Sequence, residues 1–343
     1  MPRMAVLCSL SLCATFAQAT EPAAPSAEGE PMRPIPAILD TDIGGDIDDT
    51  WALALSLRCP ELDVKLVLTD TGDTVYRARL AAKLLQVAGR TDIPVGVGLK
   101  QKSDGPRERQ KAWIEDYPLE RYPGKVHDDG VQALIDLVMG SPEPITLICI
   151  GPSPNIGEAL KREPRIAAKA RMAGMFGSFK VHHTTNRKRS VVAGQIPEWN
   201  VVKDIAAAQA IFAAPWIEAA ITPLDTCAHV VLDGPRYQRL RESKDPLMRA
   251  VIENYDLWAA GHKDSDVTRH SSVLYDTVAV YLAFSTQHLR MKKTNVRVDN
   301  KGYTVEDAAA RPVNVAMDWT NLDAFMDFLT ERLLTPVTAS SKR

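Results

Sequence analysis

The stretch Pro36-Ala-Ile-Leu-Asp-Thr-Asp-Ile-Gly-Gly-Asp-Ile-Asp-Asp-Thr-Trp51 decides how this chain folds and what it can bind. The apolar run from Ala37 to Leu39 predicts a short buried strand, and a helical pattern of apolar residues begins at Trp51. The two glycines between them permit a tight turn, because glycine tolerates backbone angles that other residues avoid. The stretch therefore predicts a strand, a turn and a helix.

Carboxylates crowd this turn, with Asp40, Asp42, Asp46, Asp48 and Asp49 all inside one short segment. Like charges at this density repel one another unless a cation lies among them, and a helix N-terminus supplies only about half a charge. Carboxylate oxygens are the ligands that calcium and magnesium prefer. A helix-capping cluster on a solvated loop is the simpler explanation, but one or two aspartates would satisfy it. The crowding therefore favours a metal site.

The same stretch resembles the signature of the inosine-uridine-preferring nucleoside hydrolase family, an Asp-x-Asp-x-Gly-x-Asp-Asp run. Asp40, Asp42 and Gly44 match the first part of this signature. Asp48 and Asp49 match the second part, after two extra residues. Because of these two residues, it stays open whether Asp46 or Asp48 takes the place of the first aspartate of the pair. The resemblance implies that Asp42 is a metal-binding general base, that Asp49 is a second carboxylate ligand, and that Asp48 faces the ribose.

Two turns after predicted strands extend the resemblance. The segment Gly151-Pro-Ser-Pro-Asn-Ile156 follows an apolar strand pattern, and the family has threonine at the place of Pro154. The family's residue binds the metal through its backbone carbonyl, so the resemblance implies the same role for Pro154. Asp73 follows another strand pattern and stands where the family has asparagine. A substrate contact and an ordinary loop-tip aspartate are equally good interpretations of Asp73.

Two short motifs near the middle and the end of the chain complete the resemblance. Glu198-Trp-Asn200 matches a Glu-Phe-Asn segment that holds ribose hydroxyls in the family. Tyr275-Asp276 matches a His-Asp pair ahead of a helix. The resemblance implies that Asp276 is the last metal ligand and a ribose contact. Tyr275 stands where purine-active members carry a histidine proton donor, and is the second catalytic candidate.

The resemblance implies a calcium-dependent hydrolase that cleaves the N-glycosidic bond of ribonucleosides into free base and ribose. Two other classes fit parts of the sequence. Haloacid-dehalogenase-like phosphatases also begin with an Asp-x-Asp run after a strand, but they need a downstream lysine and acidic pair that this pattern does not predict. A non-catalytic, exported nucleoside or sugar binder stays open, because Tyr275 replaces the histidine.

The order of the predicted elements indicates an α/β fold with a mostly parallel central sheet flanked by helices. A strand at 64–69, a helix at 77–88 and a strand at 93–98 form a βαβ unit. In such sheets ligands bind beyond the carboxyl ends of the strands, so a nucleoside hydrolase-like active site is expected there. We expect a single domain over residues 34–336, and a disordered tail over 337–343.

The ends and the composition of the chain indicate where the protein is located and which partners it has. Residues 1–19 carry an arginine, an apolar run and an Ala-Gln-Ala cleavage pattern, typical of a signal peptide. Residues 20–33 read as a disordered leader, so we expect a periplasmic or secreted protein. The net charge of -2 predicts neither nucleic-acid nor membrane-surface binding. A small nucleoside is the expected partner, and a homo-oligomer stays open.

The three cysteines outside the predicted signal peptide are Cys59, Cys149 and Cys227, and none has metal-ligand spacing with another. Buried single thiols are favoured over one disulfide, because Cys149 lies in an apolar strand pattern. The basic stretch at 178–196 is interpreted as a solvated lid or partner loop.

Overall fold

The computed structural model describes residue 1 and residues 33–101, 108–183, 191–261 and 266–337. Pro34–Arg343 form one compact unit, separate from Met1–Arg33. The predicted signal peptide, leader and tail lie almost entirely outside the described residues. Within the described part of the chain, no helix combines the length and the apolar character needed to cross a membrane.

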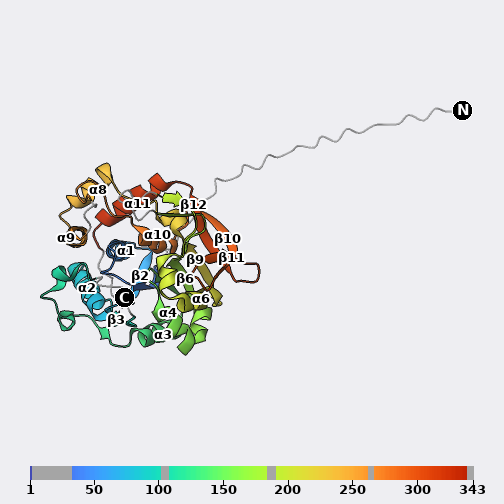
Figure 1. Cartoon of the computed structure of the whole chain (residues 1–343), viewed down its shortest axis with the longest axis horizontal. Helices are drawn as coiled ribbons and strands as arrows, with labels where there is room; N and C mark the ends of the chain where they lie inside the picture. Colours follow the sequence, from blue (N-terminus) through green and yellow to red (C-terminus); the bar gives the residue numbers. More distant parts are fainter. Residues whose placement is uncertain (2–32, 102–107, 184–190, 262–265, 338–343) are drawn as a thin grey trace. The chain divides into compact units, whose positions relative to one another are not determined.

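A central sheet of ten strands runs through the described part of the compact unit (Figure 1). Its strands lie in the order β11-β10-β12-β9-β6-β5-β1-β2-β3-β4. Their bounds are β1 Ile35–Thr41, β2 Leu62–Thr69, β3 Val95–Val97, β4 Val126–His127, β5 Ile145–Cys149, β6 Ala170–Met175, β9 Glu218–Thr222, β10 Leu289–Val298, β11 Thr304–Glu306 and β12 Pro312–Trp319. A separate hairpin consists of β7 (Val181–His183) and β8 (Val191–Ala193).

Most of the sheet is parallel, which confirms the predicted fold class. Every neighbouring pair from β12 to β4 is parallel, whereas β10 is antiparallel to both β12 and β11. Parallel neighbours need crossover connections, and helices supply them here. All carboxyl ends of the parallel strands therefore lie at one edge of the sheet.

Helices cover both faces of this sheet (Figure 1). Their bounds are α1 Asp48–Ser56, α2 Thr74–Val87, α3 Gly130–Gly140, α4 Pro154–Arg162, α5 Trp199–Lys203, α6 Ile205–Ala213, α7 Leu224–Cys227, α8 Gly234–Arg241, α9 Pro246–Ala260, α10 Tyr275–Leu282 and α11 Leu322–Leu334, with 3-10 turns η1 Lys111–Ile114, η2 Leu119–Arg121 and η3 Pro164–Lys169. One apolar cluster contains residues of α1, α2, α9, α10 and α11, and the other contains residues of α3, α4 and α6.

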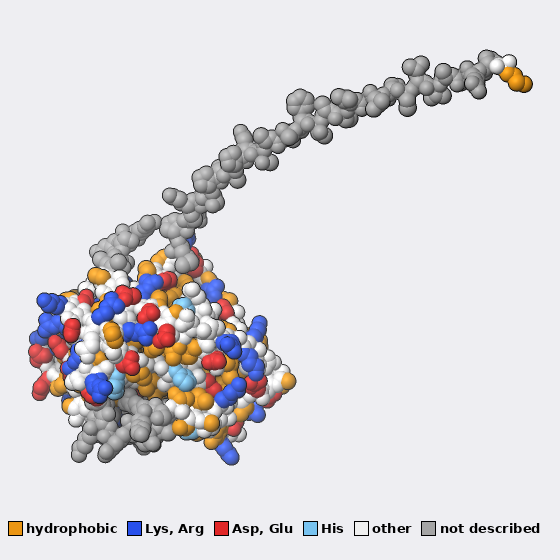
Figure 2. All heavy atoms as spheres, turned by 90° about the horizontal axis from the view of Figure 1, so that it is seen from above, with side chains coloured by type: hydrophobic (Ala, Val, Ile, Leu, Met, Phe, Trp, Pro, Cys, Tyr) orange, Lys and Arg blue, Asp and Glu red, His pale blue; other side chains and the backbone are white. Residues whose placement is uncertain are grey.

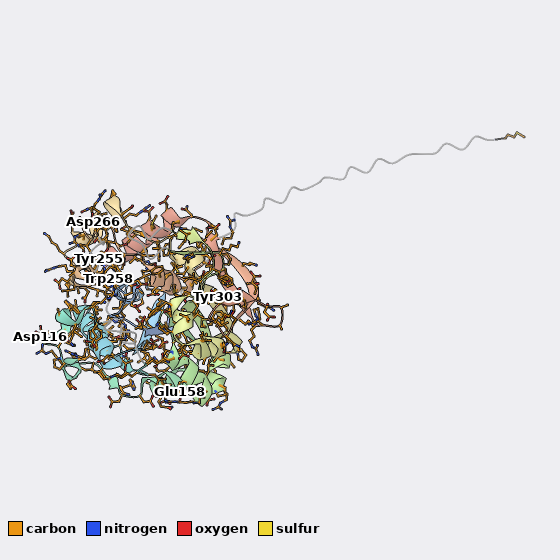
Figure 3. The ribbon with its side chains drawn as sticks, viewed as in Figure 1. Asp116, Glu158, Tyr255, Trp258, Asp266 and Tyr303 are labelled. Carbon is orange, nitrogen blue, oxygen red and sulfur yellow. The ribbon has the colours of Figure 1, made fainter. Side chains whose placement is uncertain are left out.

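Strand β1 shows why the opening stretch forms a buried strand. Ala37 and Leu39 belong to the first apolar cluster, and Ile38 belongs to the second. A strand covered on both faces needs apolar residues at consecutive positions rather than at alternate ones. The first cluster also includes aromatic residues of α9 that Figure 3 labels: the rings of Tyr255 and Trp258 lie 5.8 Å apart.

The structure differs from the sequence-based prediction near the end of the chain and adds a hairpin within the basic stretch. The sequence pattern predicts a short strand over 295–298, whereas β10 begins at Leu289 and runs antiparallel to β12. Charged residues such as Arg290 and Lys293 are exposed on β10, so no apolar run marks its first half. Within the stretch at 178–196, β7 and β8 pair as an antiparallel hairpin.

Two further sequence-based expectations concern the interior and the surface. Cys59, Cys149 and Cys227 are buried and free, which confirms the expected single thiols. Burial raises the pKa of the Cys59 thiol to about 12, so this thiol stays protonated at neutral pH. Over the face that Figure 2 shows, basic and acidic side chains are interspersed.

Candidate active site

A pocket of about 230 Å³ lies at the carboxyl ends of the central strands. Asp42 follows β1, Ile150 follows β5 and Met175 ends β6, so three neighbouring strands meet there. The residues that line the pocket are Asp42, Asp46, Asp48, Asp49, Ile150, Met175, Glu198, Trp199, Asn200, Leu224, Tyr275 and Asp276.

The turn between β1 and α1 places the aspartates at this pocket. Gly44 has a φ of +100°, and a Cβ there would lie 2.6 Å from the Tyr76 ring, so only glycine fits. The Thr41 hydroxyl accepts a hydrogen bond from the Ile43 N–H at 3.1 Å and donates one to the Asp49 carboxylate at 2.5 Å. The turn is thereby closed, and Asp49 is held at the start of α1.

Three carboxylates form a buried cluster at the centre of the pocket. Asp48, Asp49 and Asp276 are 5%, 2% and 3% exposed, and one oxygen of each lies within 4.8 Å of the others. Burial raises the pKa of each of these carboxyl groups well above its usual range, and neighbouring carboxylates raise it further. The surroundings therefore do not compensate the charge that three ionised carboxylates would carry at this position.

This arrangement fits a hard divalent cation. Two oxygens that both bind one Ca²⁺ lie at most about 5 Å apart, because each bond is about 2.3–2.6 Å long. The oxygens of the three carboxylates meet that limit, and oxygen is the ligand atom that such ions prefer. The sequence grouped Asp42 with Asp49 and Asp276, whereas the tightest cluster in the structure contains Asp48 instead. Asp42 lines the same pocket and is 9% exposed.

A second pair of acidic residues lies behind the pocket, at the ends of the neighbouring strands β1 and β2. Asn155 donates to one oxygen of Asp40 at 2.8 Å, and the Ser153 N–H donates to one oxygen of Asp70 at 3.0 Å. The other oxygen of each carboxyl group is buried without a hydrogen-bond partner among the described residues. Burial raises the pKa of Asp40 to about 6 and that of Asp70 well above its usual range.

Glu198 and Asn200 are fixed by the backbone around them. Glu198 caps α5: one oxygen accepts from the Asn200 N–H at 2.9 Å, and the other accepts from Gly177 N–H at 3.0 Å. Burial raises the pKa of Glu198 to about 7, and these N–H donors oppose the rise. The Asn200 amide nitrogen donates to the Met175 carbonyl at 3.0 Å. The amide oxygen of Asn200 is then the atom left to meet a ligand.

The pocket lining also includes an apolar and aromatic part. Ile150, Met175 and Leu224 form it, together with the rings of Trp199 and Tyr275. Such a surface suits a flat, weakly polar group held beside a polar one. The pocket therefore offers a carboxylate-rich side for hydroxyl groups and a cation, and an apolar side for a ring.

A family model described as inosine-uridine preferring nucleoside hydrolase matches residues 37–327. The chain belongs to this family. It is therefore an enzyme that acts on N-glycosyl compounds, and the resemblance seen in the aspartate stretch is confirmed. The matched region contains every residue that lines the pocket.

Individual nucleoside hydrolases match this chain over most of its length. The pyrimidine-specific ribonucleoside hydrolase RihA of Salmonella arizonae is 26% identical over 321 residues, which are 87% of this chain and 98% of the relative. A solved plant nucleoside hydrolase has a TM-score of 0.72 at 24% identity, over 88% of this chain and 100% of its own. A purine-preferring ribonucleoside hydrolase from Gardnerella vaginalis has a TM-score of 0.71 at 22% identity, with the same coverage. At these identities the two structures show a shared fold.

Two residues that the sequence placed in the site of this nucleoside hydrolase lie outside the pocket lining. Asp73 caps helix α2, where its carboxylate accepts from the Tyr76 N–H at 3.1 Å. Pro154 is the first residue of α4 and follows Ser153, whose φ is +55°. The other predicted residues all line the pocket: Asp42, Asp48, Asp49, Glu198, Asn200, Tyr275 and Asp276.

Sequence reasoning missed the residues that support the aspartate loop of this nucleoside hydrolase. Asp70 directly follows β2 as Asp42 directly follows the adjacent strand β1, and this matching position was the signal that could have found it. Asn155 joins three segments, because it bonds to Asp40, to the Thr69 carbonyl and to the Leu99 N–H. Asn155 lies in the Gly151–Ile156 turn that extends the family resemblance, and that turn was the signal that could have found it.

Proposed function

We propose that this nucleoside hydrolase cleaves the N-glycosidic bond of ribonucleosides with the help of Ca²⁺, and that Asp42 is the general base. The observation that carries the proposal is the buried cluster of Asp48, Asp49 and Asp276 beside Asp42 in one pocket. Carboxylates with strongly raised pKa values beside an apolar wall are typical of a functional site. They are stable as anions only if a cation joins them.

The proposed ligands of the ion are Asp42, Asp49 and Asp276, together with the Pro154 carbonyl. The first three line the pocket, and Asp48 lies within reach of the same ion. An ion bound there would lower the pKa of a water molecule and orient it. All these donors are oxygens, which favours calcium over softer metals.

The proposed reaction uses Asp42 to take the proton of the attacking water. Cleavage of a glycosidic bond passes through an oxocarbenium-like sugar, so the ribose must be held as its ring flattens. Asp48, Asp276, Glu198 and the Asn200 amide oxygen are the proposed acceptors for ribose hydroxyls. Contacts that strengthen as the ring distorts raise kcat, whereas equally strong ground-state contacts change only KM.

The leaving base is proposed to lie against the aromatic part of the pocket lining. Tyr275 opens α10 beside Asp276 and lines the pocket, as does Trp199. An ordinary tyrosine has a pKa of about 10, so the Tyr275 phenol can donate a hydrogen bond at neutral pH but transfers its proton less readily than an imidazolium. The proposed role of Tyr275 is therefore to orient the base.

The experiment that tests this function is an assay of purified protein against uridine, cytidine, inosine, adenosine and guanosine. Free base and ribose are measured separately, with protein that has been freed of metal and then given Ca²⁺ or Mg²⁺. We expect release of base and ribose in equal amounts, restored by calcium. Asp276→Asn serves as the matched variant, because it keeps the shape of the side chain and removes one ligand charge.

Three other results would contradict the proposal. Nucleoside binding without turnover would favour a non-catalytic binder, and phosphate release from a phosphomonoester without nucleoside cleavage would favour a phosphatase. Full activity of metal-free protein would exclude the calcium requirement while keeping the hydrolase.

We also propose that the protein is exported and that its mature chain begins near Thr20. The Ala17-Gln-Ala19 pattern supports cleavage at that point. Mass spectrometry of the periplasmic and secreted fractions tests this. Recovery of an intact Met1 species from the cytosol alone would refute it.

A further inference from the structure

Arg77 is a buried arginine directly behind the aspartate loop. Arg77 is 2% exposed, and its side chain is among the largest fully buried ones in the described part of the chain. Arginine is almost never buried to this extent unless its charge is paired. The site described above gives Arg77 no part in binding or chemistry, so its position needs a separate explanation.

The guanidinium of Arg77 joins the loops that follow β1 and β2. Its Nε donates to the Thr71 carbonyl at 2.6 Å, and its Nη1 donates to the Ile43 carbonyl at 2.7 Å. Its Nη2 lies 3.6 Å from Oδ2 of Asp42. The side chain therefore links the backbone of these two loops and places a positive charge next to the carboxylate of the proposed general base.

The same charge also acts on two carboxylates deeper in the protein. Burial raises the pKa of Asp49 and of Asp70, and the positive charge of Arg77 opposes that rise in both. Among the residues described, Arg77 thus influences Asp42, Asp49 and Asp70, each of which lies at the carboxyl end of the sheet.

The aspartate loop is shaped to lie on this part of α2. A Cβ on Gly45 would be 3.5 Å from Nη1 of Arg77, so the loop backbone passes in contact with the guanidinium. The neighbouring Tyr76 hydroxyl donates to the Gly44 carbonyl at 3.2 Å and accepts from the Gln110 N–H at 3.0 Å. Tyr76 and Arg77 together support the loop segment that carries the two extra residues.

We propose that Arg77 is a built-in counter-ion of the aspartate loop, which holds Asp42 and the loop backbone in position before a metal ion binds. Arg77 is a positioning residue in this scheme, because its contacts are with the loop and with Asp42. The inference rests on the metal site of the proposed function.

A specific coupling between Arg77 and calcium follows. The Arg77 guanidinium and a bound Ca²⁺ compensate the charge of the same carboxylates. Each therefore contributes less to stability when the other is present. Loss of the Arg77 charge should therefore destabilise the metal-free protein more than the calcium-loaded protein. By linkage, the rise in Tm that calcium produces becomes larger in the variant than in the wild type.

The experiment compares thermal unfolding of full-length wild type, Arg77→Met, Arg77→Lys and Arg79→Met, each metal-free and in saturating CaCl₂. Arg79 is the matched control, because it lies on the same helix and donates to the Tyr117 and Ile114 carbonyls at 2.8 Å and 2.6 Å. We expect the calcium-induced rise in Tm to be larger in Arg77→Met than in wild type by about 3 °C or more. In Arg77→Lys and Arg79→Met it should equal the wild-type rise.

Several results would overturn the inference. An equal rise in Arg77→Met would make the residue an ordinary structural arginine, and a smaller rise would make it part of the framework that calcium itself requires. An Arg77→Lys variant that behaves like Arg77→Met would exclude a role for the charge. If Arg77→Met does not fold in either condition, Arg77→Gln replaces it, since glutamine keeps an N–H donor without the charge.

Failure of the metal proposal is distinguishable from failure of this inference. If no divalent cation raises the Tm of the wild-type protein, the calcium site is refuted. The counter-ion role is then decided in metal-free protein, where Arg77→Met must lose more stability than Arg77→Lys. Equal losses in that comparison would overturn it.

Discussion

Asp42 differs from the other aspartates of its loop in what surrounds it. Both Asp42 and Asp49 line the pocket. One oxygen of Asp49 accepts a hydrogen bond from the Thr41 hydroxyl, whereas Asp42 lies beside the Arg77 guanidinium. A base needs access to the water whose proton it takes and a fixed orientation toward that water. Among the loop aspartates that line the pocket, Asp42 alone is recorded with a basic side chain within ion-pair distance in the described residues.

Asp42→Asn should fold and lose at least about a hundredfold in kcat, or about 2.7 kcal/mol, because an amide cannot accept the proton of water. Substrate binding should change less, since asparagine keeps the shape of the side chain. Steady-state ribose release measures both parameters. Asp116→Asn, at an exposed carboxylate, is the control for the chemical change. A kcat within about threefold of wild type would contradict the general-base role.

Tyr275→Phe should lower kcat by no more than about tenfold, or 1.4 kcal/mol, because the phenol orients the base rather than transferring a proton. Asp276→Ala, one residue further on, should abolish both metal binding and activity. The two variants are compared by nucleoside hydrolysis and by calcium titration. A thousandfold loss in Tyr275→Phe with unchanged ribose affinity would instead identify Tyr275 as the acid.

Single residues were predictable from the sequence where a motif and a strand end coincide. Asp42, Asp48 and Asp49 stand in a run whose charge density has few structural explanations, and Asp276 opens a helix in a recognisable pair. Arg77 and Asn155 act through contacts with distant loops. Such contacts leave no periodicity or spacing in the chain, so only the folded structure reveals them.

At the scale of elements, the start of helix α2 gives Asp73 a structural role. Asp73 was expected either to contact substrate or to be an ordinary loop residue, and it caps α2. Asp73→Ala should cost about 1 kcal/mol of unfolding free energy, because one N–H at the helix start loses its acceptor. We expect KM and kcat to stay within about twofold of wild type, a change of less than about 0.5 kcal/mol.

Asp129→Ala is the matched control for this substitution. Asp129 caps α3 in the same way, since it accepts from the Gln132 N–H at 2.9 Å. Urea unfolding and initial rates of both variants are compared. A rise in KM confined to Asp73→Ala would restore Asp73 to the substrate site.

The elements that the sequence predicted well are those buried on both faces of the sheet. Strands β5 and β1 are mostly apolar and buried, and the turn residues that follow each of them favour a strand over a helix. Strand β10 exposes charged residues such as Arg290 and Lys293, and the valines of β8 are only partly buried. Pairing with distant segments forms these strands, and local patterns do not contain that information.

For the whole molecule, the buried carboxyl groups set the pH dependence of metal-free stability. The folded-state pKa values of Glu198, about 7, and of Asp40, about 6, lie above their ordinary values of 4.5 and 3.8, chiefly because of burial. Each group therefore contributes stability that is fully present below the ordinary pKa and is lost as pH rises through the folded value. Metal-free protein should unfold at a lower temperature at pH 8 than at pH 5.5.

Thermal unfolding of dialysed, metal-free protein across this range measures the effect. Each proton retained only by the folded state gives a slope of about 1.4 kcal/mol per pH unit. Glu198→Gln should flatten the part of the curve between about pH 5 and pH 7. In calcium the slope should weaken, because the ion binds ionised carboxylates. A metal-free Tm that increases steadily from pH 5.5 to pH 8 would contradict the assignment.

The cluster of Asp48, Asp49 and Asp276 joins segments from opposite ends of the compact unit. The first two open α1 soon after its first strand, and the third opens α10 near its last strands. These helices pack against each other. During synthesis the aspartate loop therefore emerges long before the carboxylate that completes its cluster, and closing so long a loop costs chain entropy. A cation bound by all three carboxylates would connect the first and last thirds of the chain, and this connection forms only after Asp276 has been synthesised.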